Sequence, residues 1–154
     1  MDSIRNHDIE TLSYSPSNGF ESYREKLSQY YFNQNIHLSP EDIIVTAGGS
    51  EALAFAISCA CDPGDEVIIP EPYYANYLGF AVATGVNVIP LPCSINQEFA
   101  LPSSDIISSL VTTNTKAIVL CNPGNPTGRL YNDQELEQIR SIALNHDLYV
   151  ISDE

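Results

Sequence analysis

The chain has 154 residues, of which 44% are hydrophobic and 17% charged, a composition that suits one globular domain with a real core. Six Lys and Arg against 20 Asp and Glu give a formal net charge of −14, so no basic surface exists to neutralise nucleic acid or an anionic membrane. No apolar run is long enough to span a membrane and no export signal opens the chain, which predicts a cytoplasmic protein.

The cysteines and histidines show no pattern typical of a metal site. Cys59, Cys61, Cys93 and Cys121 have no CxxC spacing and lie within apolar segments. Such positions favour small buried side chains over a disulfide framework or a zinc site. We therefore expect all four thiols in the core and no bound metal.

The first third of the chain predicts a helix, a strand and a second helix. From Gly19 onward aromatic residues and Leu27 recur at steps of three and four residues, which indicates a helix that ends before Ser39. Residues 42–46 form a short β-branched run that predicts a strand. A Gly48-Gly49 turn follows, and residues 50–61 are apolar almost all round, as in a buried helix.

The same alternation continues to the last residues. Helical patterns cover residues 75–84, ended by Gly85, and residues 101–111, and Asn132 with Glu135 forms the capping box of a further helix. Strand patterns cover residues 66–70, 86–91, 116–121 and 148–152. Strands that are apolar on both alternating positions and separated by helices predict an α/β fold: a mainly parallel sheet with helices on both faces.

In such a sheet, ligands bind beyond the carboxyl ends of the strands, and two of these places are rich in glycine or aromatic residues. Residues 48–50 open a helix with a flexible turn and a hydroxyl, which suits either a phosphate cradle or an ordinary turn capped by Ser50. Tyr73 and Tyr74 lie between prolines and the next helix, where they would either stack on a flat ring or pack into the core.

Two other strand ends carry polar residues. Residues 122–128, with two prolines and two glycines, form a rigid loop that presents the amides of Asn122 and Asn125. Asp153 follows an apolar strand, so its carboxylate needs either a cation or a local backbone amide as partner. Arg129 could meet a carboxylate, although a solvated loop arginine is the more common case.

Six short stretches, in this order and spacing, resemble the large domain of fold type I pyridoxal-phosphate enzymes. The family they match is the class I/II aminotransferases, which includes the aspartate aminotransferases. The stretches are YSPSNG at 14–19, VTAGGSEAL at 45–53, DPGDEV at 62–67, PYY at 72–74, NPTG at 125–128 and SDE at 152–154.

The resemblance implies pyridoxal phosphate as cofactor, with its phosphate at the start of a helix. Gly49, Ser50 and Glu51 would hold the phosphate through the amino end of that helix. Tyr14 would reach the phosphate bound to the neighbouring subunit, so the expected active site belongs to a homodimer.

The resemblance also implies the residues around the cofactor ring. Tyr74 would stack on the pyridine ring and Asn125 would donate to its phenolic oxygen. Asp153 would pair with the pyridinium nitrogen and keep it protonated, so that the ring can accept electrons from the substrate.

The family's Schiff-base lysine has no match in the chain. Only Lys26 and Lys116 are present, the first in the opening helix and the second at the far end of a strand from the proposed site. The arginine-bearing C-terminal small domain, the N-terminal arm and the remaining sheet strands also have no match. We therefore expect residues 1–154 to be a partial large domain that is inactive alone.

The predicted function of the intact protein is transfer of an amino group from an amino acid to a 2-oxo acid. Three alternatives share parts of the pattern. One is an amino acid lyase or decarboxylase with the same cofactor, and another is a non-catalytic, cofactor-sensing domain of a transcription regulator. The third is an α/β domain that binds a different phosphate ligand.

Overall fold

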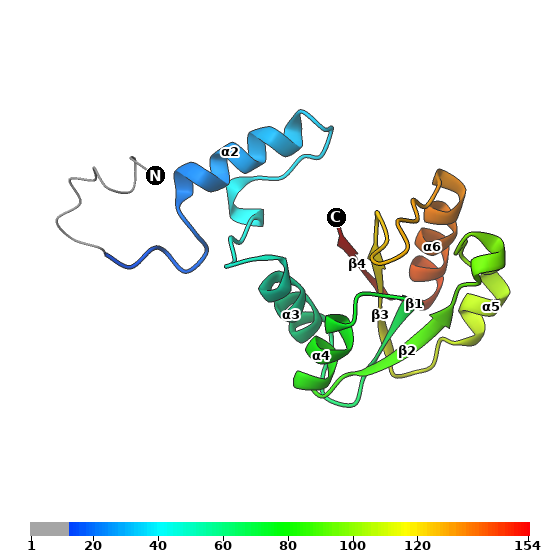
Figure 1. The fold of residues 1–154 in the computed structure, drawn as a ribbon. Helices are drawn as coiled ribbons and strands as arrows, with labels where there is room; N and C mark the ends of the chain where they lie inside the picture. Colours follow the sequence, from blue (N-terminus) through cyan, green and yellow to red (C-terminus); the bar gives the residue numbers. More distant parts are fainter. Residues whose placement is uncertain (1–12) are drawn as a thin grey trace. The chain divides into compact units, whose positions relative to one another are not determined.

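The computed structural model describes residues 13–154. The chain divides into two compact units, Met1–Ala47 and Gly48–Glu154, and each is described by itself (Figure 1). Every strand found in residues 13–154 belongs to the second unit. That unit also contains all the predicted cofactor residues except Tyr14.

The second unit alternates helices and strands, as the sequence predicts. Its strands are β1 (Glu66–Glu71), β2 (Asn87–Pro92), β3 (Thr115–Cys121) and β4 (Tyr149–Asp153). Its helices are α3 (Gly49–Ala60), α4 (Asn76–Ala83), α5 (Ser104–Ser109) and α6 (Asp133–His146), with a 3-10 turn, η2, at Ile95–Gln97. Of the predicted segments, 101–111 differs most, because Ser103 is still extended and the helix begins only after it.

The strands form one parallel sheet in the order β2-β1-β3-β4. Ile68 in β1 lies opposite Ile89 in β2 and Ile118 in β3, and Cys121 at the end of β3 lies opposite Asp153 in β4. Parallel neighbours require crossover connections, and the helices supply them. The predicted α/β architecture is confirmed.

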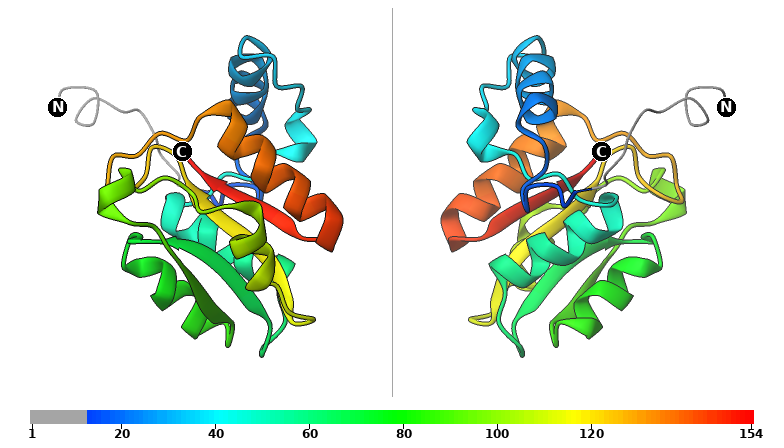
Figure 2. Two further views of the ribbon diagram at one scale, coloured as in Figure 1. Left: turned by 90° about the vertical axis from the view of Figure 1, so that its right-hand side faces the viewer. Right: turned by 90° about the vertical axis from the view of Figure 1, so that its left-hand side faces the viewer.

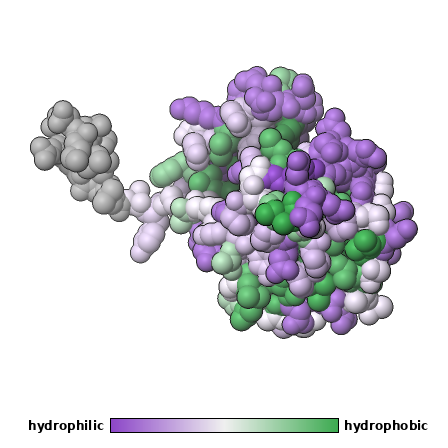
Figure 3. Space-filling view, turned by 45° about the vertical axis from the view of Figure 1, so that its right-hand side comes forward, coloured by the Kyte–Doolittle hydropathy of each residue, from purple (hydrophilic) through white to green (hydrophobic). Residues whose placement is uncertain are grey.

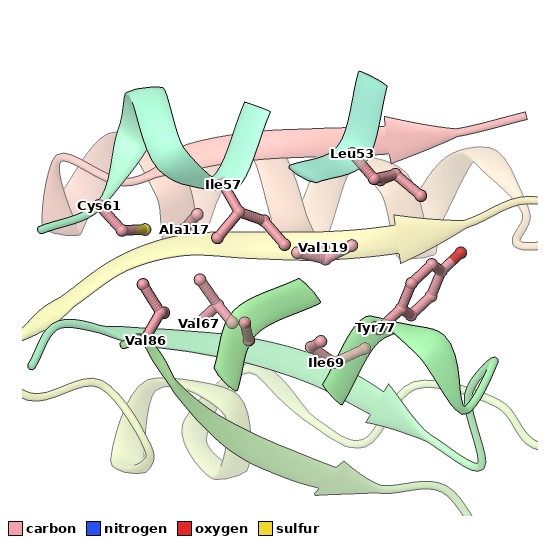
Figure 4. Packing of buried hydrophobic residues seen from close by; sticks show 10 residues of the cluster. Leu53, Ile57, Cys61, Val67, Ile69, Tyr77, Val86, Ala117 and Val119 are labelled. Atoms are coloured by element: carbon pink, nitrogen blue, oxygen red, sulfur yellow. The ribbon is translucent and has the colours of Figure 1, made fainter. Parts of the chain in front are cut away.

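Helices cover both faces of this sheet (Figure 2). Val67, Ile69 and Val119 pack beneath α3 and α4 (Figure 4), whereas their neighbours Ile68 and Ile118 pack beneath α5 and α6. All five side chains are at most 1% exposed. Because successive residues face opposite layers and both layers are apolar, the central strands read as continuous apolar runs.

Two helix-end signals in the sequence are also confirmed. The Asn132 side chain accepts a hydrogen bond from the Glu135 amide at 3.0 Å, and the Glu135 carboxylate accepts one from the Asn132 amide at 2.9 Å, so α6 begins with the predicted capping box. Gly85 follows α4 with a φ of +76°, a left-handed conformation that glycine adopts most readily.

In the first unit the prediction of a strand over residues 42–46 is wrong. From residue 13 onward this unit contains α2 (Glu21–Phe32) and the 3-10 turn η1 (Pro40–Asp42), and no strand. The Val45 amide donates to the Asn18 carbonyl at 3.1 Å, which is a single contact and not a ladder. β-branched residues favour extended backbone, but a strand also needs a paired neighbour.

Gly19 and Arg24 hold the first unit together locally. Gly19 has a φ of +91°, and a Cβ added there would lie 2.6 Å from the Cβ of Val45, so a larger residue does not fit. Arg24 is only 8% exposed, and its guanidinium donates to the carbonyls of Gly19 and Pro40.

The prediction that all four cysteines lie in the core is confirmed for Cys61 alone. Cys59 is exposed, and Cys93 and Cys121 are half-buried. On α3, Leu53 and Ile57 share the buried face and Cys59 lies on the opposite side, while Cys61 is buried just after the helix ends. Apolar composition all round a helix therefore does not specify which side is buried.

The molecular surface mixes polar and apolar side chains. On the face shown in Figure 3, hydrophobic patches alternate with hydrophilic ones. Val82, Leu144 and Tyr149 are each more than 60% exposed. Among the described residues, no helix combines the length and the hydrophobicity that a membrane span requires.

We expect Ile118→Ala to destabilise the sheet unit, because Ile118 is fully buried between β1 and the α5–α6 layer. The expected loss in free energy of unfolding is about 3 kcal/mol, within the usual range for isoleucine in a packed core. Urea denaturation followed by circular dichroism measures it. Ile106→Ala, at a position 51% exposed on α5, is the matched control, and an equal loss in both variants would contradict the assigned core.

Candidate cofactor site

The carboxyl ends of β3 and β4 bring Asp153 beside the loop that follows β3. Asp153 lies opposite Cys121 in the register, and its carbonyl accepts a hydrogen bond from the Asn122 amide at 3.0 Å. Ile151, two residues earlier on β4, packs against the cluster beneath α3 and α4. Because alternate residues of a strand share a face, the Asp153 side chain points toward the same helices.

Tyr77 of α4 holds this carboxylate. Its hydroxyl donates to Oδ2 of Asp153 at 2.5 Å, and its ring is 1% exposed within the core cluster (Figure 4). Burial and then the hydrogen bond to Asp153 raise the pKa of Tyr77 above its ordinary value of 10.0. The phenol therefore stays protonated and acts as a donor.

The sequence analysis missed Tyr77. The signal that could have found it is a tyrosine in the first turn of a mostly apolar helix, three residues after Tyr74. A buried tyrosine hydroxyl needs a hydrogen-bond partner, and a partner from another element brings two segments together. Which partner it takes becomes visible only once α4 and β4 are placed.

The two predicted stacking residues both contact the ring of Tyr77. Tyr73 stacks on it with ring centroids 6.3 Å apart, and Tyr74 meets it edge-on at 5.7 Å and 89°. The Tyr74 hydroxyl accepts from the Asn76 amide group at 2.6 Å. Both tyrosines are half-buried against the core cluster, so part of each side chain stays accessible.

The loop after β3 uses its two asparagines differently. The Asn122 side-chain oxygen accepts from the Tyr131 amide at 3.0 Å, so Asn122 helps to close the loop through that oxygen. Asn125 is exposed. With Tyr73, Tyr77 and Cys121 it lines a cavity of about 20 Å³, room for one water molecule and not for a ring.

The start of α3 has the form of an anion site. The first intrahelical bonds are donated by the Glu51 and Ala52 amides to the Gly48 carbonyl, at 3.1 and 3.2 Å, so the Gly49 and Ser50 amides precede the hydrogen-bond ladder. A Cβ added at Gly48 or Gly49 would meet nothing within 4 Å. Glycine at these positions therefore leaves space for a ligand close to the backbone.

Three of the residues considered for this chemistry lie elsewhere. Tyr14 belongs to the first unit and is fully exposed in the single chain. Lys26 lies in α2. Lys116 lies at the amino end of β3, five residues before Cys121 and so about 16 Å from it along the strand at the usual rise.

The residues at the strand ends fit pyridoxal phosphate in their chemistry. Of the residues in 13–154, Tyr77 is the hydrogen-bond donor to the Asp153 carboxylate, and neither ion pair found there involves Asp153. A part-buried carboxylate without a cation suits a protonated ring nitrogen. Of the three predicted phosphate residues, Gly49 and Ser50 have amides that precede the hydrogen-bond ladder, whereas the Glu51 amide donates to the Gly48 carbonyl and the Glu51 carboxylate has the same charge as a phosphate. The described residues contain no cluster that could hold a metal ion.

Arg129 pairs with a carboxylate and is not a solvated loop arginine, the more common case. Its Nη2 donates to both Glu135 oxygens, at 3.0 and 2.9 Å, with the two side chains 20% and 10% exposed. Burial raises the pKa of Glu135, but hydrogen bonds from the Asn132 and Leu101 amides and from Arg129 outweigh burial and leave that pKa below its ordinary 4.5.

Comparison with known proteins identifies the family. Residues 4–154 match the family described as aminotransferase class I and II. The aspartate/prephenate aminotransferase of Thermus thermophilus is 37% identical over 145 residues, which cover 92% of this chain and 37% of that protein. The aspartate aminotransferase of Pyrococcus abyssi is 34% identical over 149 residues, covering 96% of this chain and 38% of that protein.

Solved structures give the same answer. The aspartate aminotransferase from Thermus thermophilus with maleate superposes with a TM-score of 0.87 at 34% identity, over 92% of this chain and 37% of that one. The alanine aminotransferase from Pyrococcus furiosus superposes with a TM-score of 0.89 at 32% identity, over 99% of this chain and 38% of that one.

The parallel sheet and the residues at its carboxyl edge define a domain of the fold that these aminotransferases share. The chain belongs to the aminotransferase class I and II family. It spans about 37% of the length of the relatives it matches. Its interpretation as a partial large domain, and the cofactor roles of the individual residues, stay predictions.

We expect Tyr77→Phe to lower the stability of the sheet unit, because Asp153 then loses its hydroxyl donor while the ring still fills the core. A hydrogen bond to a charged group contributes roughly 1.5–3 kcal/mol, and the free energy of unfolding in urea measures the loss. Tyr149→Phe, at a 64% exposed position of β4, is the control. Equal stability of Tyr77→Phe and wild type would contradict this contact.

The lowered pKa of Glu135 predicts an acid-sensitive fold. Since the folded state holds this carboxylate ionised below its ordinary pKa of 4.5, the stabilisation is present above that pH and is lost as the pH falls through the folded-state value. Glu135→Gln is therefore expected to cost roughly 1.5–3 kcal/mol at neutral pH and progressively less at acid pH.

Unfolding in urea across the acid range compares this variant with wild type. The control is Glu137→Gln, whose partner Arg140 and own side chain are 66% and 61% exposed, and whose pair is worth less than about 1 kcal/mol. Parallel stability curves for Glu135→Gln and wild type would show that Glu135 does not titrate with folding.

Proposed function

We propose that the intact protein is a pyridoxal-phosphate-dependent aminotransferase that transfers an amino group from an amino acid to a 2-oxo acid. The observation that carries this proposal is the Asp153 carboxylate, which a buried tyrosine holds at the end of β4. When bound, the cofactor supplies a pyridinium ring that withdraws electrons from the substrate α-carbon. A fixed carboxylate at that nitrogen is the partner that such a ring requires.

The chain's own residues divide the work of binding. The Gly49 and Ser50 amides at the start of α3 bind the phosphate, with Glu51 next to them in the same first turn, and the helix dipole also favours an anion there. Asn125 donates its side-chain amide to the phenolic oxygen from an exposed loop position. Tyr74, held by its edge-on contact with Tyr77, stacks its ring on the cofactor ring.

We also propose a homodimer located in the cytoplasm. Tyr14 is fully exposed in the single chain, which is consistent with a contact to the phosphate of a neighbouring subunit. The substrates are small amino and oxo acids. A net charge of −14 disfavours nucleic acid and anionic membranes as partners.

The family supports transamination over the lyase, regulator and general phosphate-binding alternatives. The relatives and structures named above are aminotransferases, although the substrates in their names differ and include aspartate, prephenate and alanine. The cofactor residues of this chain contact only the cofactor in the proposed arrangement. They therefore do not select the amino donor.

Binding of pyridoxamine phosphate tests the cofactor site, because this form needs no covalent bond to a lysine. We expect calorimetry to show binding to the wild-type chain in preference to adenosine monophosphate. Asp153→Asn should weaken it by at least about tenfold, as expected for loss of one charge-assisted hydrogen bond. Glu137→Gln, which removes an exposed carboxylate from α6, should leave the affinity unchanged.

Two results would count against this site. Equal affinity for pyridoxamine phosphate and the nucleotide would favour a general phosphate-binding domain. Unchanged affinity in Asp153→Asn would remove the ring-nitrogen assignment. The activity itself is tested on the product of the whole reading frame that contains this chain, where Asp153→Ala should abolish most turnover while some cofactor stays bound through its phosphate.

A further inference from the structure

We propose that Arg129 and Glu135 form a positioning pair, which holds the loop of residues 122–130 so that Asn125 meets the cofactor. This inference rests on the proposed function, because it assigns the pair a role in that same site. The pair lies outside the set of residues expected to touch the cofactor. Its effect would be transmitted through the backbone of the loop.

The Arg129–Glu135 contact differs from an ordinary surface ion pair. Arg129 Nη2 bridges both carboxylate oxygens at 2.9 and 3.0 Å, and the side chains are only 20% and 10% exposed. The other ion pair found in residues 13–154, Arg140–Glu137, has side chains 66% and 61% exposed. Partial burial makes the first pair costly to break, whereas the second contributes little.

Glu135 is a fixed anchor for this arginine. Its oxygens also accept from the Asn132 amide at 2.9 Å and from the Leu101 amide at 3.0 Å. One carboxylate thus joins the start of α6, the segment before α5 and the arginine. An arginine bound to such a group has little freedom to move away from α6.

The main chain of Arg129 closes the turn that carries Asn125. The Arg129 carbonyl accepts from the Gly124 amide at 2.7 Å, and its own amide donates to Oγ1 of Thr127 at 3.2 Å. The Gly128 amide donates to the Gly124 carbonyl at 2.6 Å. Whatever fixes the guanidinium of Arg129 therefore also fixes the backbone on both sides of Asn125.

Asn125 has no anchor of its own in the described part of the chain. Its side chain is exposed, and no hydrogen bond of that side chain occurs within residues 13–154. Its position is therefore inherited from the loop. A cofactor-binding amide held in this way depends on the rigidity of its supporting residues.

One buried nitrogen of Arg129, Nε, lacks a hydrogen-bond partner among the described residues. A buried donor without a partner is rare in native proteins and calls for an explanation. The guanidinium is oriented by its contact with both Glu135 oxygens, and this orientation leaves Nε without a partner in the described part of the chain.

The experiment measures the affinity of the chain for pyridoxamine phosphate by calorimetry. Arg129→Gln should weaken binding about tenfold, the size of coupling usual within one hydrogen-bond network. Arg140→Gln, the matched control on the exposed pair, should bind like wild type. Arg129→Lys keeps the charge and is expected to bind with intermediate affinity.

A role through Asn125 has a signature that general destabilisation lacks. In an Asn125→Ala background, Arg129→Gln should cause no further loss of affinity. The same substitution should also leave unchanged the binding of a pyridoxamine phosphate analogue without the ring hydroxyl, since Asn125 then has no oxygen to meet. Urea unfolding checks that each variant is folded at the temperature of the measurement.

The outcomes separate the two proposals. If the wild-type chain does not bind pyridoxamine phosphate, the proposed function fails and the positioning role fails with it. If wild type binds and Arg129→Gln binds equally well, the positioning role alone is overturned. An equal loss with and without Asn125, or with both ligands, overturns it too, because the pair then serves only the stability of the fold. Should Arg129→Gln not fold, Arg129→Lys supplies the same comparison.

Discussion

Parallel pairing of β1, β3 and β4 determines where the candidate site lies. Because these strands run in one direction, the segments that follow them open at the same edge of the sheet. The register also decides which face each side chain takes: Ile151 packs beneath α3 and α4, and Asp153, two residues on, meets Tyr77 on that face. A slip of one residue would turn Asp153 toward α5 and α6, so core packing and site geometry obey the same constraint.

Tyr77 joins the core to the site within a single side chain. Its ring is buried with Ile69 and Val119, and its hydroxyl reaches the Asp153 carboxylate at the end of β4. Tyrosine suits this place because most of its surface is apolar while one end donates a hydrogen bond. The helix that covers the sheet is thereby held to the strand end, and the carboxylate is oriented by packing instead of by a flexible surface contact.

Much of the fold could be predicted from local patterns, whereas contacts between distant segments could not. Apolar runs, Gly85 and the Asn132–Glu135 box predict the strands and helix ends of the sheet unit to within about one residue, except at residues 101–111, where α5 is shorter than predicted. The prediction of a strand over residues 42–46 was wrong because a strand needs a paired neighbour, which local composition does not reveal. The Tyr77–Asp153 and Arg129–Glu135 contacts could not be predicted for a related reason. Hydrogen-bond partners follow from topology, and neither pair has a spacing that a sequence pattern identifies in advance.

Two of the residues predicted to contact the cofactor ring, Asp153 and Asn125, are held in place by different parts of the structure. Asp153 takes its position from sheet register and from Tyr77, inside a core whose central side chains are almost fully buried. Asn125 takes its position from a loop closed by the Arg129 main chain and tied to α6 through one part-buried carboxylate. A change in the loop can loosen the second contact while the first persists, because the loop's anchors are polar groups at the edge of the sheet and not members of the apolar layers. The rigidity of these supporting groups decides how precisely a ligand is held, because affinity depends on how the donors are arranged before the ligand binds.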